Sequence, residues 1–308
     1  MKNNALFVGA IASILLASCG STAKTGNSHA KKTIQLPAFN KEGHRGTRGL
    51  MPENTIPSMY KAIDHGVNTV EVDVVYSKDG QVVISHDVYF HPDITTTPDG
   101  RYLTSKEAQK HLLYTMTYDS IRKYDVGMKP HEDFPQQAKI PVYKPLLSEL
   151  IDSTDLYAKS KGISILYNIE LKTNKANDSI KHPPVEEFVD GVMKVVNEKK
   201  LSSRCYLQSF DFRPLQILNR KYPEIATAVL IGGNEKRSLD QILKDLGYKP
   251  EMYSPHYSLV TAQLVKECHD RGIKLIPWTV NTVEDMRRMK ALGVDGIITD
   301  YPNYFSEL

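Results

Sequence analysis

Short apolar runs alternate with amphipathic stretches along most of the chain from residue 40 onward. The apolar runs predict strands, and the stretches between them predict helices because their apolar residues recur every three or four positions. The predicted strands lie around Gly43 and His44 and at 68–75, 163–170, 204–210, 225–231, 251–254, 273–280 and 294–299. The predicted helices lie at 55–65, 145–161, 184–199, 212–221, 237–246, 259–271 and 282–292. This alternation predicts an α/β fold, a (β/α)8 TIM barrel.

A doubly wound open sheet is the rival architecture, and the sequence does not favour it. No glycine-rich loop of the kind that binds nucleotides follows any of the predicted strands. Residues 88–143, about 55 residues rich in Pro, Gly, Asp and Tyr, interrupt the alternation. We expect them to form an insertion on the loops at the carboxyl ends of the strands.

The stretch from Val70 to Asp87, VEVDVVYSKDGQVVISHD, predicts a β-hairpin after the second strand. Side chains alternate along a strand, so Glu71 and Asp73 share one face and the valines share the other. A two-residue loop would place Asp73 opposite His86, whereas a four-residue loop would place Glu71 opposite His86. Either register puts His86 on the face that carries the carboxylates.

Two carboxylates inside a barrel require a compensating positive charge. An arginine or a lysine could supply this charge, and so could a divalent metal ion. The sequence YNIELK at 167–172 favours the metal, because it ends another strand with Glu170. Three carboxylates without a cysteine form an oxygen site that suits one divalent cation, Ca²⁺ or Mg²⁺.

The first strand ends on GHRG, which places His44 and Arg45 at the carboxyl end of the barrel, where barrel enzymes hold their active sites. A single histidine is more often a packed or surface residue than a catalytic one. His44 and His86 differ from the other histidines of the chain because both are predicted at the same barrel mouth as the carboxylates.

The amino-terminal residues predict a targeting segment. Lys2 precedes an apolar stretch, 5–17, which is too short to span a bilayer. The following residues, LASCG, resemble a bacterial lipoprotein signal, and this resemblance implies a signal peptide at 1–18 and a lipid-modified Cys19. An ordinary secretory signal is the alternative. We expect a flexible tether at 19–38, the barrel at 39–308, and a lipid-anchored location in the bacterial cell envelope, on its periplasmic or surface side.

Charge and cysteine content limit the possible partners and crosslinks. The 308-residue chain has a formal charge of +3 without a basic stripe, so we do not expect a nucleic acid partner. Cys205 and Cys268 could form a disulfide, or each could act as a small core residue. The sequence does not indicate an oligomeric state.

Taken together and in order, the motifs EGHRG, PENT, VEVDVVYSKDGQVVISHD, YNIELK, QSF, PWTVN and DGIITDYP resemble the glycerophosphodiester phosphodiesterases. This resemblance extends from about residue 41 to residue 304. It implies a metal-dependent barrel enzyme that splits glycerophosphodiesters into sn-glycerol 3-phosphate and an alcohol. The nucleophile would be the glycerol 2-hydroxyl, which gives a cyclic phosphate, or a water molecule.

The resemblance also implies roles for individual residues. It makes His44 the general base and His86 the general acid, and it places Arg45 and Lys172 on the substrate phosphate. It implies that the metal ligands are Glu71, Asp73 and Glu170, and that the substrate pocket includes Gln208, Phe210 and Trp278. Those three pocket residues could equally be packing residues, and Arg48 could contact either substrate or solvent.

Two other functions remain open at this stage. A barrel phosphodiesterase of the phospholipase C or sphingomyelinase D kind would act on intact lipids, which a membrane anchor would bring within reach. A non-catalytic lipoprotein that binds phosphodiesters is the second. The complete set of histidines, carboxylates and cations argues against this second function.

Overall fold

The computed structural model describes residues 1–2 and 34–308. The predicted signal peptide, Cys19 and most of the predicted tether therefore lie outside the described residues. Among the helices that are described, none is both long and apolar enough to cross a membrane.

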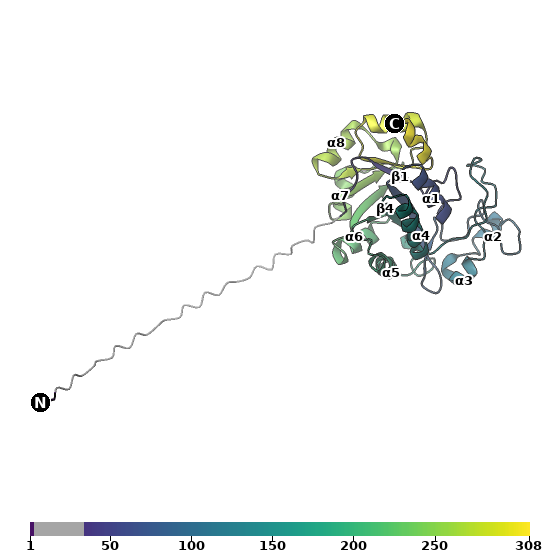
Figure 1. Ribbon diagram of the computed structural model, residues 1–308, viewed down its shortest axis with the longest axis horizontal. Helices are drawn as coiled ribbons and strands as arrows, with labels where there is room; N and C mark the ends of the chain where they lie inside the picture. The colour runs from purple at the N-terminus through teal and green to yellow at the C-terminus, as the bar shows by residue number, and fades with distance from the viewer. Residues whose placement is uncertain (3–33) are drawn as a thin grey trace.

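Eight parallel strands and their intervening helices form a barrel, as predicted (Figure 1). Around the sheet the strands are ordered β8-β7-β6-β5-β4-β2-β1-β9, and β3 pairs with β2 alone. Their bounds are β1 (Asn40–Gly43), β2 (Thr69–Tyr76), β3 (Val82–Ile84), β4 (Leu166–Leu171), β5 (Cys205–Ser209), β6 (Ala226–Ile231), β7 (Met252–Pro255), β8 (Lys274–Leu275) and β9 (Gly296–Thr299).

The helices that cover the barrel match the predicted positions to within a few residues at each end. They are α1 (Ile56–Asp64), α4 (Leu147–Ser160), α5 (Val185–Glu198), α6 (Phe212–Lys221), α7 (Leu239–Leu246), α8 (Ala262–Asp270) and α9 (Val283–Ala291). Short 3₁₀ turns follow some of the strands, namely η2 (Lys175–Asn177), η3 (Tyr257–Leu259) and η4 (Pro302–Glu307).

The predicted strand at 273–280 is much shorter in the structure, where β8 spans only Lys274–Leu275. Pro277 follows closely, and proline has no backbone N–H to donate to a strand partner. The barrel still closes at this point through backbone hydrogen bonds. Asp295 N donates to Leu275 O over 2.9 Å, and Ile298 N donates to Pro277 O over 3.0 Å.

Strand β2 presents its two faces to different surroundings. Val70, Val72 and Val74 are fully buried and belong to the hydrophobic cluster that also contains residues of the surrounding helices. Because side chains alternate along a strand, Glu71 and Asp73 point to the opposite face, the barrel interior. The predicted inward orientation of these two carboxylates is consistent with their complete burial.

The hairpin forms as predicted, but both predicted registers are wrong. Val74 pairs with Ile84, and Tyr76 pairs with Val82. The loop has three residues, whereas the two predictions had two and four. Gly80 adopts a left-handed φ of 74°, which closes this three-residue turn. Ser85, not His86, therefore lies opposite Asp73, and its N–H donates to Asp73 O over 3.0 Å.

The insertion, residues 88–143, contains α2 (Ser105–Ala108), η1 (Leu113–Thr115) and α3 (Tyr118–Ile121). Figure 1 shows α2 and α3 to one side of the barrel. Buried residues of the insertion form a second hydrophobic cluster together with Val75 and Val83 of the hairpin. The hairpin thus anchors the insertion beside the carboxyl ends of the strands.

The two cysteines are free and buried in the described structure, so the core interpretation is confirmed. Cys205 lies in β5 and Cys268 in α8. Burial raises the pKa of each thiol to about 12.

The residues just before β1 contact the barrel. Ile34 and Leu36, near the end of the predicted tether, pack against a cluster that includes Tyr206, Ala226 and Met252. These three residues lie at the amino ends of β5, β6 and β7. The segment therefore covers apolar residues at the end of the barrel opposite the predicted active site.

Candidate active site

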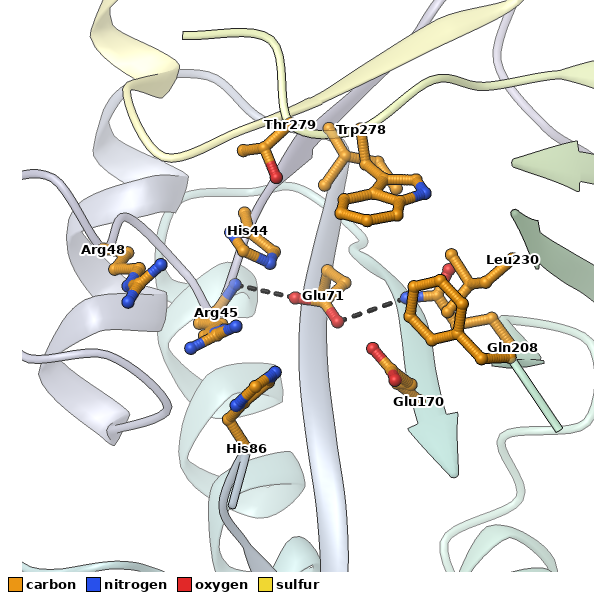
Figure 2. Close-up of a pocket in the computed structure, with 12 residues that line it drawn as sticks. His44, Arg45, Arg48, Glu71, His86, Glu170, Gln208, Leu230, Trp278 and Thr279 are labelled. Carbon is orange, nitrogen blue, oxygen red and sulfur yellow. Dashed lines mark hydrogen bonds between the residues drawn. The ribbon is translucent and has the colours of Figure 1, made fainter. Parts of the chain in front are cut away.

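A central cavity of about 300 Å³ lies at the carboxyl ends of the strands. Figure 2 shows the side chains that surround it. Its lining residues come from loops and strands all around the barrel and are His44, Arg45, Arg48, Glu71, His86, Glu170, Gln208, Phe210, Leu230, Trp278, Thr279 and Ile298.

Three carboxylates converge beside this cavity. Glu71 and Asp73 come from β2, and the parallel register of β2 with β4 places Glu170 next to Asp73. One oxygen of each residue lies within 4.8 Å of the others, and all three residues are buried. The structure thus brings together the predicted ligand set.

Burial and the neighbouring charges shift the pKa values of all three carboxylates. Burial, together with the neighbouring Asp73 and Glu170, raises the pKa of Glu71 well above its usual range. Burial also raises the pKa of Glu170, although Lys172 opposes this shift. Burial would likewise raise the pKa of Asp73, but Lys172 and Arg45 outweigh it and lower that pKa well below its usual range.

Unsatisfied oxygen atoms in the cluster fit a bound divalent cation. Asp73 Oδ1 is buried and accepts no hydrogen bond, and the ammonium of Lys172 lies 3.6 Å away. Gln208 Oε1 is also buried without a partner, while Gln208 Nε2 donates to Glu71 Oε1 over 3.2 Å. A set of oxygen donors without sulfur suits Ca²⁺ or Mg²⁺.

The loop after β1 holds Arg45 in an unusual backbone conformation. Arg45 has a φ of 48°, a left-handed value that is uncommon for a residue other than glycine. Its N–H donates to Glu71 Oε2 over 2.8 Å, and its carbonyl accepts a bond from Asn54 N over 3.0 Å. The loop is therefore fastened directly to the carboxylate cluster.

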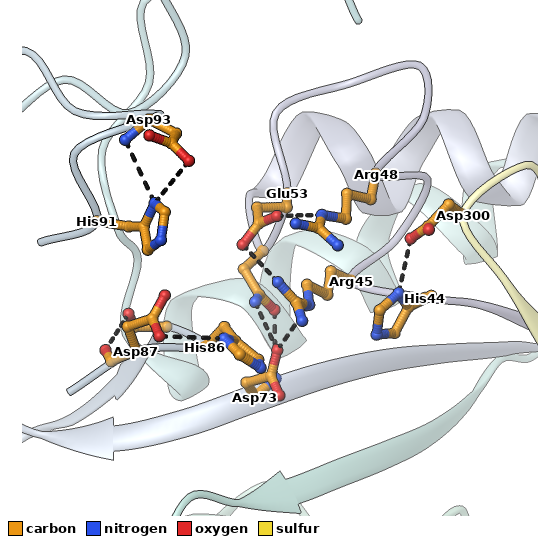
Figure 3. A network of polar contacts seen from close by, with 12 residues as sticks. His44, Arg45, Arg48, Glu53, Asp73, His86, Asp87, His91, Asp93 and Asp300 are labelled. Carbon is orange, nitrogen blue, oxygen red and sulfur yellow. Dashed lines mark hydrogen bonds and ion pairs between the residues drawn. The ribbon is translucent and has the colours of Figure 1, made fainter. Parts of the chain in front are cut away.

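The Arg45 guanidinium bridges two acidic residues. Its Nη1 lies 2.8 Å from Glu53 Oε1, and its Nε lies 3.3 Å from Asp73 Oδ2. Asn54, also left-handed with a φ of 57°, donates from Nδ2 to Asp73 Oδ2 over 2.8 Å. Figure 3 shows this network, and Figures 2 and 3 both show the Arg45 guanidinium between the rings of His44 and His86.

His44 is held by the residue that follows β9. His44 Nδ1 lies 2.6 Å from Asp300 Oδ1, and the second oxygen of Asp300 accepts a 2.7 Å bond from Asn281 Nδ2. Burial lowers the pKa of His44, although Asp300 opposes this shift. A neutral His44 can then accept a proton on Nε2 while Asp300 fixes its Nδ1–H.

His86 reaches the cavity from the loop after β3. Its Nδ1 lies 3.3 Å from Asp87 Oδ1, and a third of its side chain is exposed. Lys172 follows β4 and its ammonium lies 2.7 Å from Glu170 Oε1. The two predicted proton-transfer residues thus share one cavity, and the His44 side chain is the less exposed of the two, at 13% against 34%.

The three predicted pocket residues, Gln208, Phe210 and Trp278, all line the central cavity. Phe210 remains 44% exposed and packs edge-to-face against Trp278, with ring centroids 5.3 Å apart. Trp278 Nε1 donates to Ser254 O over 3.0 Å, which fixes the indole at the cavity wall. Arg48 also lines the cavity, where its Nε lies 2.5 Å from Glu53 Oε2 and its guanidinium stacks on Phe134.

Comparison with known proteins identifies the family. A profile described as the glycerophosphoryl diester phosphodiesterase family matches residues 44–304, which is most of the chain. This chain belongs to the glycerophosphoryl diester phosphodiesterase family. The predicted family and the prediction of a phosphoric diester hydrolase are therefore confirmed.

Individual members of the family are similar over nearly their whole length. A glycerophosphodiester phosphodiesterase of Caldanaerobacter subterraneus subsp. tengcongensis is 31% identical over 84% of this chain and 93% of its own. A crystal structure of a Silicibacter pomeroyi protein assigned to the family is 32% identical, with a TM-score of 0.78, and covers 90% of this chain and 95% of its own. A phosphodiesterase of Oleispira antarctica, solved with the product sn-glycerol-3-phosphate, has the same fold at 24% identity, a TM-score of 0.69, and coverage of 88% of this chain and 96% of its own.

Several polar residues at the site of this family member were not predicted from its sequence. Asp300 and Asn281 orient His44, Asp87 contacts His86, and Glu53 binds two arginines. Within the motif PENT, Thr55 is the N-cap of α1, and Asn54 donates from Nδ2 to Asp73 Oδ2. The sequence does hold one signal for Asp300, because a charged residue that directly follows the last strand lies at the carboxyl end of the barrel.

Proposed function

We propose that this chain hydrolyses glycerophosphodiesters to sn-glycerol 3-phosphate and an alcohol with the help of one divalent cation, Ca²⁺ or Mg²⁺. The observation that carries the proposal is the cluster of Glu71, Asp73 and Glu170, which opens on a cavity lined by His44 and His86. The relative from Oleispira antarctica, which was solved with sn-glycerol-3-phosphate, supports the choice of product.

Fixed positive charge is the first requirement of the reaction, because negative charge grows on the phosphate oxygens as the ester bond breaks. A cation held by Glu71, Asp73 and Glu170 would supply part of this charge. Arg45 supplies a further part from beside the cluster, where Glu53 and Asp73 fix its guanidinium. Lys172, which lies against Glu170, completes it from the other side.

Proton transfer falls to the two histidines. His44 takes the proton of the attacking oxygen, which we take to be the glycerol 2-hydroxyl, as a new P–O bond forms. His86 gives a proton to the departing alcohol as the old P–O bond breaks. A water molecule then opens the resulting cyclic phosphate and yields sn-glycerol 3-phosphate, with the histidines acting in reversed roles.

The direct test is release of glycerol 3-phosphate from glycerophosphocholine and glycerophosphoethanolamine by the protein without its first 19 residues. We expect release to stop with EDTA and to return with Ca²⁺ or Mg²⁺. Glu71→Ala should abolish both the activity and the rise in melting temperature that the metal ion produces, because it removes one of three ligands. Activity that persists in EDTA, or in Glu71→Ala, would contradict the proposed metal dependence.

We also propose that Cys19 is lipid-modified and holds the enzyme in the bacterial cell envelope. The proposal rests on the sequence LASCG alone. Mass spectrometry of the amino-terminal peptide from envelope-extracted protein should show acylated Cys19, and Cys19→Ala should release the protein from the membrane fraction. A mature protein that begins with an unmodified residue other than Cys19 would contradict this assignment.

A further inference from the structure

Three cavities meet at His86, and only one of them also contacts His44. Besides the central cavity, a second cavity of about 320 Å³ lies toward the insertion. A third, of about 270 Å³, lies between the loop after β3 and the loop after β4. We call the third the loop cavity; its walls include Asp87, Tyr89, Thr173, Asn174 and Phe210.

This arrangement separates the two halves of a diester. With His44 as the base, the attacking glycerol lies in the central cavity, since His44 lines no other. The departing alcohol lies next to the acid His86, and therefore extends into the second cavity or into the loop cavity. The identity of the alcohol depends on which of these two receives it.

Charged groups of both signs line the two cavities. The second cavity is lined by the guanidinium groups of Arg45 and Arg48 and by four carboxylates, those of Glu53, Asp87, Asp93 and Asp133. The loop cavity is lined by Asp87, Glu170 and Lys172, and the Lys172 ammonium is bound by Glu170 at 2.7 Å and lies 3.6 Å from Asp73. Charge alone therefore does not decide between the two cavities, but aromatic side chains do, because Tyr89 and Phe210 line the loop cavity and no phenylalanine, tyrosine or tryptophan is among the lining residues of the second.

Aromatic rings and a carboxylate are the groups that the loop cavity offers for recognition. Phe210 leaves 44% of its surface exposed, and it lines both the central cavity and the loop cavity. Tyr89, which is half-buried, lines the loop cavity as well, next to Asp87. Aromatic faces together with a carboxylate form the environment that binds methylated ammonium groups.

The hydroxyl groups of the same cavity are already engaged within the protein. Thr173 Oγ1 donates to Asp211 over 3.0 Å, and Ser209 Oγ donates to Leu171 O over 2.9 Å. Asn174 Oδ1 accepts a bond from Ala176 N over 2.9 Å. The hydroxyl groups of Thr173 and Ser209 are therefore not free to donate to a polyhydroxy alcohol, which would have to bond to Asp87 or to the side-chain amides of this cavity instead.

We propose that the loop cavity is the subsite for the departing alcohol and that it selects a quaternary ammonium alcohol of the choline class through Tyr89, Phe210 and Asp87. This proposal rests on the phosphodiesterase function proposed above. The selection arises because the cavity stabilises a cation that carries no hydrogen-bond donors.

The test compares kcat/KM for glycerophosphocholine with kcat/KM for glycerophosphoglycerol, whose departing alcohol is neutral and of similar size. We expect the wild-type enzyme to favour the choline diester by at least about tenfold. Tyr89→Leu should reduce this ratio by about three- to tenfold, which is the effect of losing one aromatic face. Tyr89→Phe should preserve the ratio, because it keeps the ring.

Tyr102→Leu is the matched control, because Tyr102 is 53% exposed on the insertion and lines none of the three cavities. The ratio should stay at the wild-type value in this variant. A wild-type enzyme that cleaves both diesters equally well, or a Tyr89→Leu variant with an unchanged ratio, would overturn the subsite. Absence of glycerol 3-phosphate from both diesters would instead overturn the proposed function itself.

Discussion

Asp300 and His44 form a pair whose geometry suggests that the carboxylate sets the state of the imidazole. The two side chains are 2.6 Å apart, and Asp300 is held in turn by Asn281, which accepts from its backbone N–H and donates to its side chain. An anion at Nδ1 fixes the tautomer that leaves Nε2 free to accept a proton, and it stabilises the imidazolium that then forms.

Replacing Asp300 by asparagine should therefore slow the reaction strongly. In Asp300→Asn, one of the two oxygens that now face His44 Nδ1 and Asn281 Nδ2 becomes an NH2 group, which donates and cannot accept. We expect kcat/KM to fall by about 10²- to 10⁴-fold. Since Asp300 raises the pKa of His44, its removal lowers that pKa further, and the acid limb of the pH profile should move to lower pH.

A second histidine–aspartate pair provides the control for this pH profile. His269 Nε2 lies 2.8 Å from Asp295 Oδ2, and Asp295 directly precedes β9, at the amino ends of the strands and so at the end of the barrel opposite the cavity. Asp295→Asn should leave both kcat/KM and the acid limb unchanged. A profile of Asp300→Asn that coincides with the wild-type profile would show that Asp300 does not act through His44.

At the residue scale, the sequence predicted those side chains that stand out from the pattern of their own strand. Glu71 and Asp73 were predicted because they occupy inward positions of a strand that is otherwise apolar, and the structure shows both of them buried. Asp300 was not predicted to contact His44, because the two residues are separated by 256 positions. Contacts of this kind are set by the closure of the barrel and leave no local pattern.

At the scale of elements, the alternation of strands and helices was predictable and the hairpin register was not. Each barrel strand is buried over most of its length and each covering helix has one apolar face, so the periodicity is strong. The register depends on one glycine, Gly80, whose left-handed φ selects the turn. A shift of the pairing register by one residue exchanges the two faces of a strand. His86 still lines the cavity, because β3 ends at Ile84 and His86 lies in the loop that follows.

Two glycines with similar backbone angles should respond differently to alanine. Gly46 has a φ of 84°, and a Cβ there would lie 2.4 Å from Ser58 Oγ and 2.7 Å from the backbone of Ser58 in α1. Gly80 has a φ of 74°, and a Cβ there would meet no atom within 4 Å. Gly80→Ala therefore carries the cost of the left-handed conformation alone, about 1 kcal/mol.

We expect Gly80→Ala to retain full activity and Gly46→Ala to lose most of it. The collision with α1 must displace the loop that carries His44 and Arg45, so the free energy of unfolding should fall by more than in Gly80→Ala. Urea unfolding and kcat/KM, measured on both variants, test this pair. Equal effects of the two substitutions on activity would show that the Gly46 loop does not position the catalytic groups.

Across the whole molecule, the barrel interior changes in character from one end to the other. Ile34 and Leu36 pack against apolar residues at the amino ends of the strands. A buried polar group follows, in which Glu42 accepts hydrogen bonds from Asn40, Asn168 and Tyr206. The carboxylate cluster and the cavity come next, because Glu42 is level with Thr69, two residues before Glu71 on β2.

Glu42 should make the stability of the enzyme depend on pH. Burial raises the pKa of Glu42 from 4.5 to about 7, although hydrogen bonds from Tyr206, Asn168 and Asn40 oppose the shift. A carboxyl whose pKa is higher in the folded state contributes stability at low pH that is lost as the pH rises toward 7. This loss amounts to roughly 3 kcal/mol for such a shift.

Glu42→Gln should remove this dependence, because an amide stays neutral at every pH. At pH 5 the variant should be less stable than the wild type, since the amide replaces one acceptor oxygen with a donor. As the pH rises to 8, the free energy of unfolding of the variant should rise relative to that of the wild type by up to roughly 3 kcal/mol. Urea unfolding at both pH values measures this change, with the activating metal ion present at saturation. Glu284→Gln, on the exposed surface of α9, serves as the control. The difference in free energy of unfolding between Glu42→Gln and the wild type could instead stay constant from pH 5 to pH 8. This result would contradict the prediction, because it would mean that Glu42 stays charged throughout and that its three hydrogen-bond donors outweigh the cost of burying the charge.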